Sequence, residues 1–517
     1  MMGAKILETS RLHPPSRPQS PISTVLSILD ATVVRFAPTG AIWIFDNDSP
    51  TEIVGNLKGS FTKTLEAFPQ WAGQLQWAPV RDNGSHRERF NRPMITYGLD
   101  SDPGVEWNVV QLDSSPVSVA PEPAKQASDE LWIENFPQSD LMISSTKMAL
   151  YDLDTFQGLS SMIVQVTLLG NSGYAVAVKI AHPLADAHTL MLFMRRWASI
   201  CRDELTEQNL TKDLAYPIFE PSLLDSRAAG DIDAPDGDPE PISKARSLPL
   251  LRHDWWDTTA GNLAALTPST INSKPKDAAL LQKAMLSPAC PPPWETWDFS
   301  KSVTTALIHF TGDELERLKK SATGTTARVS RLDALLAHVW AAISRARSPL
   351  LQNDDEVFLD FTIGVRGRVS PALPDTFVGS PLVLTHISTP TRNIGALNTK
   401  IEPIASQIRT CLDRFTSEAV AAILHDEAHE VAPQRLWRSF LGTKHTLVTS
   451  WARLGVNDID FVGNGLRPRY VHAIMSPLDG LLCVMDSGML DGGLDVSLSL
   501  ESEALQRFLK DGRLRKI

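Results

Sequence analysis

Two residues that can exchange a proton, His182 and Asp186, lie four positions apart in the run AHPLAD at 181–186. A neutral imidazole is the usual group that takes a proton from an alcohol near pH 7. A nearby carboxylate can hold such a ring in one tautomer. The H-x-x-x-D spacing therefore indicates a general base at His182. The alternative is a non-catalytic histidine followed by an aspartate that a helix N-terminus favours by its dipole.

The elements around His182 are expected to be a β-hairpin followed by a helix. Residues 161–169 and 174–180 are strand-like, and the turn signal GNSG lies between them at 170–173. After Asp186, apolar residues recur at helical spacing from Leu190 to Cys201. His182 should thus lie at the end of a strand and just before a helix, where rigid elements can hold a side chain.

The rest of the chain mixes strand and helix patterns, which predicts an α/β (α+β) fold. Residues 33–45 are rich in β-branched and aromatic side chains, which favours strand, with a likely turn at 38–40. The other expected elements are the helix 57–68, the strand 303–310, the helix 331–345 with a Ser330/Asp333 capping box, the strands 357–365, 470–475, 481–485 and 493–500, and the helix 502–510. Composition divides the chain into a polar, disordered N-terminus (1–25), an N-terminal domain (26–227), an acidic Pro/Gly-rich crossover linker (228–300) and a C-terminal domain (301–517).

Composition also narrows the class of function. The net charge of −11 disfavours nucleic acid as a partner, because affinity for nucleic acid depends on Lys and Arg. No apolar run is long enough to span a bilayer, and the N-terminus lacks the apolar core of a signal peptide. Four widely spaced cysteines fit reduced thiols in a cytoplasmic protein. His425 and His429 have a spacing that can bind zinc, but no third ligand is evident, so the expectation is a solvated helix face and no metal.

Six blocks of the sequence, in order, resemble the motifs of the BAHD acyltransferases, which belong to the chloramphenicol-acetyltransferase-like superfamily. Together they span about residues 26 to 511. The blocks are LKGSFTKTLEAFPQWAGQL (57–75), KIAHPLADA (179–187), RLDALLAHVWAAISRAR (331–347), GVRGRVSPALPDTFVG (364–379), TSWARLGVNDIDF (449–461) and the stretch from Asp491 to Phe508.

This resemblance implies two chloramphenicol-acetyltransferase-like domains, each a mixed β-sheet with flanking helices, joined by a long crossover. A channel between the halves would admit acyl-CoA as cosubstrate, with acetyl-CoA expected as donor, and a small-molecule alcohol as acceptor. His182 would deprotonate the hydroxyl in a ternary complex, and no acyl-enzyme and no permanently bound cofactor is expected. The expected protein is a monomeric O-acyltransferase acting on a hydrophobic secondary metabolite, with an amine as the alternative acceptor.

The resemblance also suggests roles for residues away from His182. Thr449 is the candidate donor to the oxyanion, and Trp451 would help to shape the substrate site. Asp186 would turn away from the site and pair with Arg366, or failing that with Arg368. Asp460 would be structural.

Two departures from the family pattern indicate a divergent, fungal-type member. The family's D-F-G-W-G is DFVGNG at 460–465, and Gly364 stands where plant members usually carry Asp. Two other interpretations stay open. One is a condensation-domain-like enzyme that uses carrier-bound thioesters, which Ala181 and Ala187 disfavour because that group usually has H-H-x-x-x-D-G. The other is an inactive homologue that acts as a binding or scaffold protein.

Overall fold

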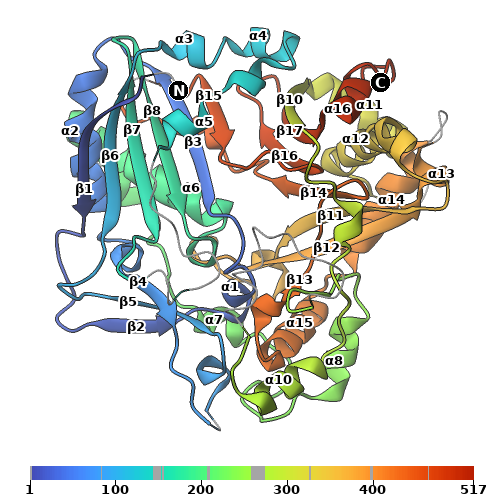
Figure 1. Ribbon diagram of the computed structural model, residues 1–517. Helices are drawn as coiled ribbons and strands as arrows, with labels where there is room; N and C mark the ends of the chain where they lie inside the picture. The colour runs from blue at the N-terminus through green and yellow to red at the C-terminus, as the bar shows by residue number, and fades with distance from the viewer. Residues whose placement is uncertain are drawn as a thin grey trace.

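Two six-stranded sheets dominate the computed structural model, which describes residues 3–82, 84–143, 153, 157–206, 210–257, 274–324, 328–395, 400–463 and 465–516. Figure 1 shows the two sheets side by side, the first mostly blue to green and the second mostly orange to red. The mixed sheets with flanking helices confirm the predicted fold class.

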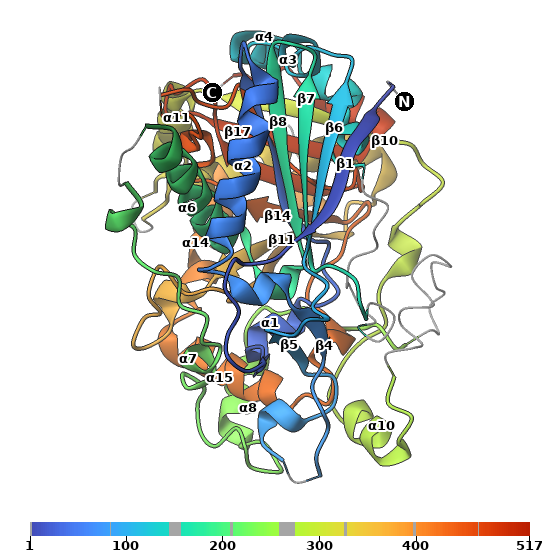
Figure 2. The same ribbon diagram turned by 90° about the vertical axis from the view of Figure 1, so that its left-hand side faces the viewer.

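The N-terminal sheet has strands from both halves of the chain. Its order is β1 (Lys5–Leu12), β6 (Val105–Leu112), β7 (Met162–Leu169), β8 (Gly173–Ile180), β3 (Thr39–Asp46) and β15 (Tyr470–Ala473). The hairpin β7–β8 is the one that the turn signal GNSG predicts. Figure 2 shows α2 (Pro50–Thr64) and α6 (Ala187–Thr206) lying over one face of this sheet. The two helices pack through aromatic side chains such as Phe61 and Trp197, whose ring centroids are 5.0 Å apart.

The expectation of disorder over residues 1–25 is wrong. Lys5–Leu12 form β1, which pairs antiparallel with β6, and Ile22–Val25 form β2, which pairs with β5 (Pro93–Tyr97). Most β1 side chains remain exposed or half-exposed. An edge strand of this kind is held by backbone hydrogen bonds and needs little apolar sequence, so its composition resembles that of a disordered segment.

The C-terminal sheet is covered on one face by helices. Its order is β10 (Val303–Phe310), β17 (Leu494–Glu501), β16 (Leu481–Asp486), β14 (His445–Ser450), β11 (Glu356–Gly364) and β12 (Leu382–Pro390). The covering helices are α11 (Gly312–Ala322), α12 (Arg331–Arg347), α14 (Ile401–Asp413) and α16 (Ser502–Leu509). The predicted Ser330/Asp333 capping box is present at the start of α12.

The crossover lies against α15 (Ser417–His429) and is held there by α8 (Pro239–Arg246) and a short bridge between β9 (His253–Asp254) and β13 (Leu436–Trp437). The solvated face expected at His425 and His429 is wrong. His425 is fully buried, and its two ring nitrogens meet the carbonyl of Ala229 and the amide of Asp238 at 2.6 and 2.8 Å. The acidic segment supplies backbone partners for the imidazole, which spacing alone could not reveal.

The remaining elements are short. They are β4 (Gln74–Trp77), α1 (Ile28–Thr32), α3 (Pro116–Val119), α4 (Pro123–Ser128), α5 (Gln138–Leu141), α7 (Ser222–Asp225), α10 (Ala278–Met285) and α13 (Thr391–Ile394). Among the helices of the described residues, none is both long enough and apolar enough to cross a membrane.

Candidate active site

His182 follows the buried strand β8 by two residues and begins a short 3-10 turn, His182–Leu184. Its ring packs edge-on against Phe36, with centroids 5.4 Å apart. A second partner is Ser380, which lies just before β12. The Oγ atom of Ser380 is 3.2 Å from His182 Nδ1. The base predicted from the H-x-x-x-D spacing therefore sits between the two halves of the chain.

The hydrogen bonds around His182 determine which ring nitrogen is free. The Ser380 hydroxyl donates its only proton to the His182 backbone carbonyl. The same oxygen must therefore accept from Nδ1–H. The ring also hydrogen-bonds its own carbonyl. Both contacts favour the tautomer with the proton on Nδ1, which leaves the lone pair on Nε2.

Burial keeps this imidazole neutral near pH 7. It lowers the pKa of His182, and this outweighs the Asp186 charge and the bond to the histidine's own carbonyl, which both raise the pKa. A neutral ring with an unprotonated Nε2 can accept a proton from a hydroxyl.

The Asp186 carboxylate forms a two-pronged ion pair with Arg366, at 2.5 and 3.0 Å. Burial raises the pKa of Asp186, but the charge and hydrogen bonds of Arg366 outweigh it and hold that pKa below its usual value. Arg368 instead donates to the carbonyls of Leu412 and Phe415. The structure thus brings Asp186 together with the first of the two predicted arginines.

The ion pair also holds the segment that carries Ser380. Arg366 Nη2 donates to the Thr189 hydroxyl at 2.8 Å and lies 3.3 Å from the Gly379 carbonyl. The Asp186 amide donates to the same carbonyl at 3.2 Å. The loop of the candidate base and its Ser380 partner are therefore fixed to one another.

Thr449 lies on β14, directly beside Cys483 of β16. Along β16 the side chains alternate: Leu482 and Val484 pack under the helices, whereas Cys483 and Met485 join the core of the N-terminal half. Paired residues point to the same side of a sheet, so Thr449 faces the half that carries His182. Among the described residues, no hydrogen bond engages the Thr449 hydroxyl.

Trp451 and Asp460 both lie in packed surroundings. Trp451 is 5% exposed and belongs to the core of the N-terminal half, and it is not among the residues that line the cavity described below. Asp460 accepts from the amides of Val462, Gly463 and Gly465 at 2.8 to 3.0 Å. This placement fits the structural role expected of Asp460, and a substrate contact by Trp451 stays a prediction.

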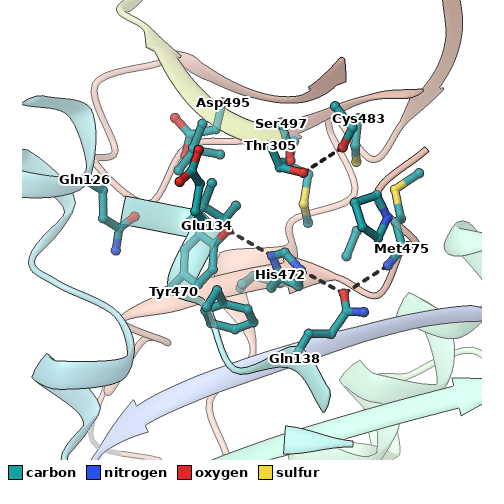
Figure 3. A pocket seen from close by; sticks show the side chains of 18 of the residues that line it. Gln126, Glu134, Gln138, Thr305, Tyr470, His472, Met475, Cys483, Asp495 and Ser497 are labelled. Carbon is teal, nitrogen blue, oxygen red and sulfur yellow. Dashed lines mark hydrogen bonds between the residues drawn. The ribbon is translucent and has the colours of Figure 1, made fainter. Parts of the chain in front are cut away.

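A cavity of about 350 Å³ lies between the two sheets, lined by β15 on one side and by β10, β16 and β17 on the other (Figure 3). It includes neither His182 nor Thr449 in its lining. Cys483 lines it and pairs with Thr449. At its other side, Ile474 donates to the Gly40 carbonyl, and Thr39 pairs with Ile180 at the end of β8.

Gly40 is needed for this close approach. A Cβ atom at that position would lie 2.6 Å from the Val178 carbonyl oxygen and 3.2 Å from the Ile474 side chain. No side chain fits there without moving backbone, so the glycine allows the segment after β15 to lie against β3 and β8.

Two residues that support His182 were missed from the sequence. Ser380 lies one residue past the block 364–379 that resembles the family, and Asp30 belongs to no recognisable motif. The Asp30 carboxylate accepts from the Ser380 amide at 2.6 Å, and burial raises the pKa of Asp30 to about 7. Only the fold brings positions 30, 182 and 380 together. Among the described residues, no cluster of three or more potential metal ligands occurs.

The chain is similar to known acyltransferases over almost its whole length. The model of the Transferase family matches residues 141–249 and 257–514. The acyltransferase AFT15-1 of Alternaria alternata is 24% identical over 99% of this chain and 97% of its own, and the acyltransferase abl6 of Leptosphaeria maculans is 24% identical over 99% and 98%. The structure of F. graminearum TRI101 complexed with coenzyme A and deoxynivalenol superposes with a TM-score of 0.69 at 16% identity, covering 96% of this chain and 98% of TRI101.

Proposed function

Because the chain belongs to the Transferase family, that of the BAHD acyltransferases, we propose that this acyltransferase moves an acyl group from coenzyme A to a hydroxyl group of a hydrophobic small molecule. TRI101 was crystallised with coenzyme A and deoxynivalenol, which supports this donor and this class of acceptor. Acetyl-CoA is the donor we propose.

The observation that carries the proposal is the orientation of His182. Its Nδ1 side is occupied by Ser380 and by its own carbonyl, so Nε2 is the nitrogen left to act as a base. Nε2 takes the proton of the acceptor hydroxyl as that oxygen attacks the thioester carbon. The tetrahedral intermediate then expels the CoA thiolate, which takes the proton back from His182. No acyl-enzyme forms.

Thr449 is our candidate for stabilising the negative oxygen of the intermediate. Its hydroxyl lies on the sheet face directed at the N-terminal half, and no described residue hydrogen-bonds to it. A single donor of this kind is typically worth ~3 kcal/mol of barrier. Asp186, paired with Arg366, holds the His182 loop and takes no proton, and Asp460 holds the loop after it.

The test is release of free thiol from acetyl-CoA with a panel of hydrophobic alcohols. We expect His182→Ala to lose roughly 100- to 10,000-fold in kcat/KM, with its melting temperature close to wild type. His188→Ala is the matched control, because His188 is two residues past Asp186 and its ring meets the carbonyl of Asp375 instead.

Two outcomes would contradict the proposal. Turnover by His182→Ala at the wild-type rate would refute the base. Absence of thiol release by the wild type with every alcohol and amine would favour the inactive homologue instead, or, if a carrier-bound thioester were used, the condensation-like enzyme.

A further inference from the structure

The cavity between the two sheets contains a chain of three polar side chains. Tyr470 and His472, both on β15, lie with the Tyr470 hydroxyl 3.1 Å from His472 Nδ1. His472 Nε2 lies 3.0 Å from Gln138 Oε1, and the Met475 amide nitrogen lies 3.2 Å from the same oxygen. Figure 3 shows both bonds meeting on Gln138, the first residue of α5.

The direction of every bond in this chain is determined. A backbone N–H can only donate, so the Gln138 atom next to Met475 is the carbonyl oxygen. His472 must then donate to that oxygen from Nε2, and its Nδ1 must accept from the Tyr470 hydroxyl. Burial lowers the pKa of His472 to about 3, so the pattern stays the same at neutral pH.

At the end of this row of hydrogen bonds, the NH₂ group of Gln138 has no acceptor among the described residues. Both bonds to Gln138 use its oxygen, so neither of them engages its NH₂ group. Gln138 lines the cavity, and no described residue accepts from its amide nitrogen. A carboxamide nitrogen carries two hydrogens, and leaving it without an acceptor when a ligand displaces water is costly.

The other strongly polar groups at the cavity disfavour an anionic ligand. Arg469 is neutralised by Asp46 and Glu122. Asp495 is paired with His309. Glu134 lies on the cavity wall and is exposed, so an anionic ligand would be repelled. Much of the remaining wall is apolar, including Phe136, Leu307, Val471 and Met485.

We infer that this cavity binds the acceptor as a neutral, largely apolar alcohol that also carries a carbonyl oxygen, and that the Gln138 NH₂ group recognises that oxygen. The inference rests on the proposed function for the identity of the reaction. It adds a second recognition point, remote from the reacting hydroxyl. The Met475 amide donates to Gln138. The preceding residue, Ile474, donates its amide to the carbonyl of Gly40, which lies beside the end of β8. These backbone contacts link the cavity wall to the end of β8, two residues before His182.

A matched pair of probes tests the inference: a decalin alcohol, and the same skeleton with an added ring ketone. The wild type should bind and acetylate the ketone-bearing alcohol about tenfold better than the plain one. Gln138→Glu keeps an oxygen for Met475 and His472 but replaces the NH₂ group with a second oxygen. The preference should disappear or reverse in this variant.

Gln407→Glu is the control, since the Gln407 amide donates to the Ser388 carbonyl on an exposed surface. This variant should keep the tenfold preference. Binding of both probes is measured by ligand-observed NMR without acetyl-CoA, beside the thiol-release assay. Loss of the binding preference in Gln138→Glu supports the inference even if no turnover occurs, in which case only the proposed reaction fails. Equal binding of the two probes to the wild type, no binding of either, or an unchanged preference in Gln138→Glu overturns it.

Discussion

At the scale of single residues, the candidate site contains polar side chains that each have one atom not used in a hydrogen bond within the part of the chain that the structure describes. Ser380 and the backbone occupy Nδ1 of His182, so Nε2 is the free nitrogen. Thr449 also has a polar atom available. Its position on β14 directs the hydroxyl toward the other half of the chain, and no described residue hydrogen-bonds to it.

For Thr449, removing the hydroxyl and retaining it should give different results. Thr449→Ala should lower kcat about 100- to 1,000-fold with little change in KM, because the oxyanion exists only along the reaction path. Thr449→Ser keeps the donor and should recover most of that loss. Equal losses in both variants, measured by steady-state kinetics, would mean that the methyl group and not the hydroxyl matters.

The pH dependence should report the ionisation of His182. The active form is neutral, and burial lowers its pKa below the ordinary 6.5. Activity should therefore be complete at pH 7 and fall as the pH drops through a value below 6.5. The measurement is kcat/KM against pH, with circular dichroism to show that the protein stays folded.

Two variants identify the group responsible for that acidic limb. His188→Gln should keep it, although burial also lowers the pKa of His188. Asp30→Asn should keep it as well, although burial raises the pKa of Asp30 to about 7. If either variant removed the acidic limb, that limb would not report the ionisation of His182.

At the scale of elements, the loop before α6 and the segment before β12 are joined by one buried ion pair. Asp186→Ala leaves Arg366 buried without its partner, which typically costs ~3–5 kcal/mol. The pKa of Asp186 in the folded protein is lower than the ordinary value of 3.8. The ion pair therefore stabilises the fold fully above pH 3.8, and this stabilisation is lost as the pH falls through the pKa of the folded state. We expect a lower melting temperature and lower activity.

Replacing both partners separates stability from positioning. Asp186→Ala with Arg366→Met should regain part of the stability lost in Asp186→Ala, because no charge is left unpaired. It should not regain activity, since the His182 loop is no longer held to Gly379. Arg368→Met is the control, as the Arg368 guanidinium donates to the carbonyls of Leu412 and Phe415 and not to Asp186. An unchanged melting temperature in Asp186→Ala would contradict the role of the pair.

The elements themselves were largely predictable, because strong local patterns specify them. The hairpin around GNSG, the strand β10 and the capped helix α12 all lie where periodicity places them. Edge strand β1 was not, since its stability comes from a partner about 100 residues away. Within the candidate site, the position of His182 at the end of β8 and the Asp186–Arg366 pair followed from motifs. Ser380, Asp30 and Gln138 did not, because their contacts exist only once distant strands meet.

At the scale of the molecule, the two halves share their cores. The core of the N-terminal sheet includes Leu307, Trp451, Tyr470 and Met485 from the second half, and that of the C-terminal sheet includes Ile28 and Leu29 from the first. β15 also completes the N-terminal sheet by pairing with β3. A domain boundary near residue 300 therefore matches the change in composition, but each hydrophobic core contains residues from both sides of it.

This sharing predicts one cooperative unfolding transition, despite the length of the chain. Neither half can lose its packing without exposing the other, so a calorimetric scan should give a single peak. Tryptophan fluorescence and far-ultraviolet circular dichroism should change at the same temperature. Two resolved transitions would show that the halves unfold as independent domains.

The position of β15 also sets the order of events while the chain is being synthesised. Arg469, just before β15, pairs with Asp46 at the end of β3, and 423 positions separate the two in the sequence. At ~5–20 residues per second, a ribosome needs roughly 20 to 85 s to cover that distance. Throughout this interval the edge of β3 lacks its strand and is open to pairing with other chains. Nascent chains that stall before residue 470 should therefore be the ones that most need chaperones.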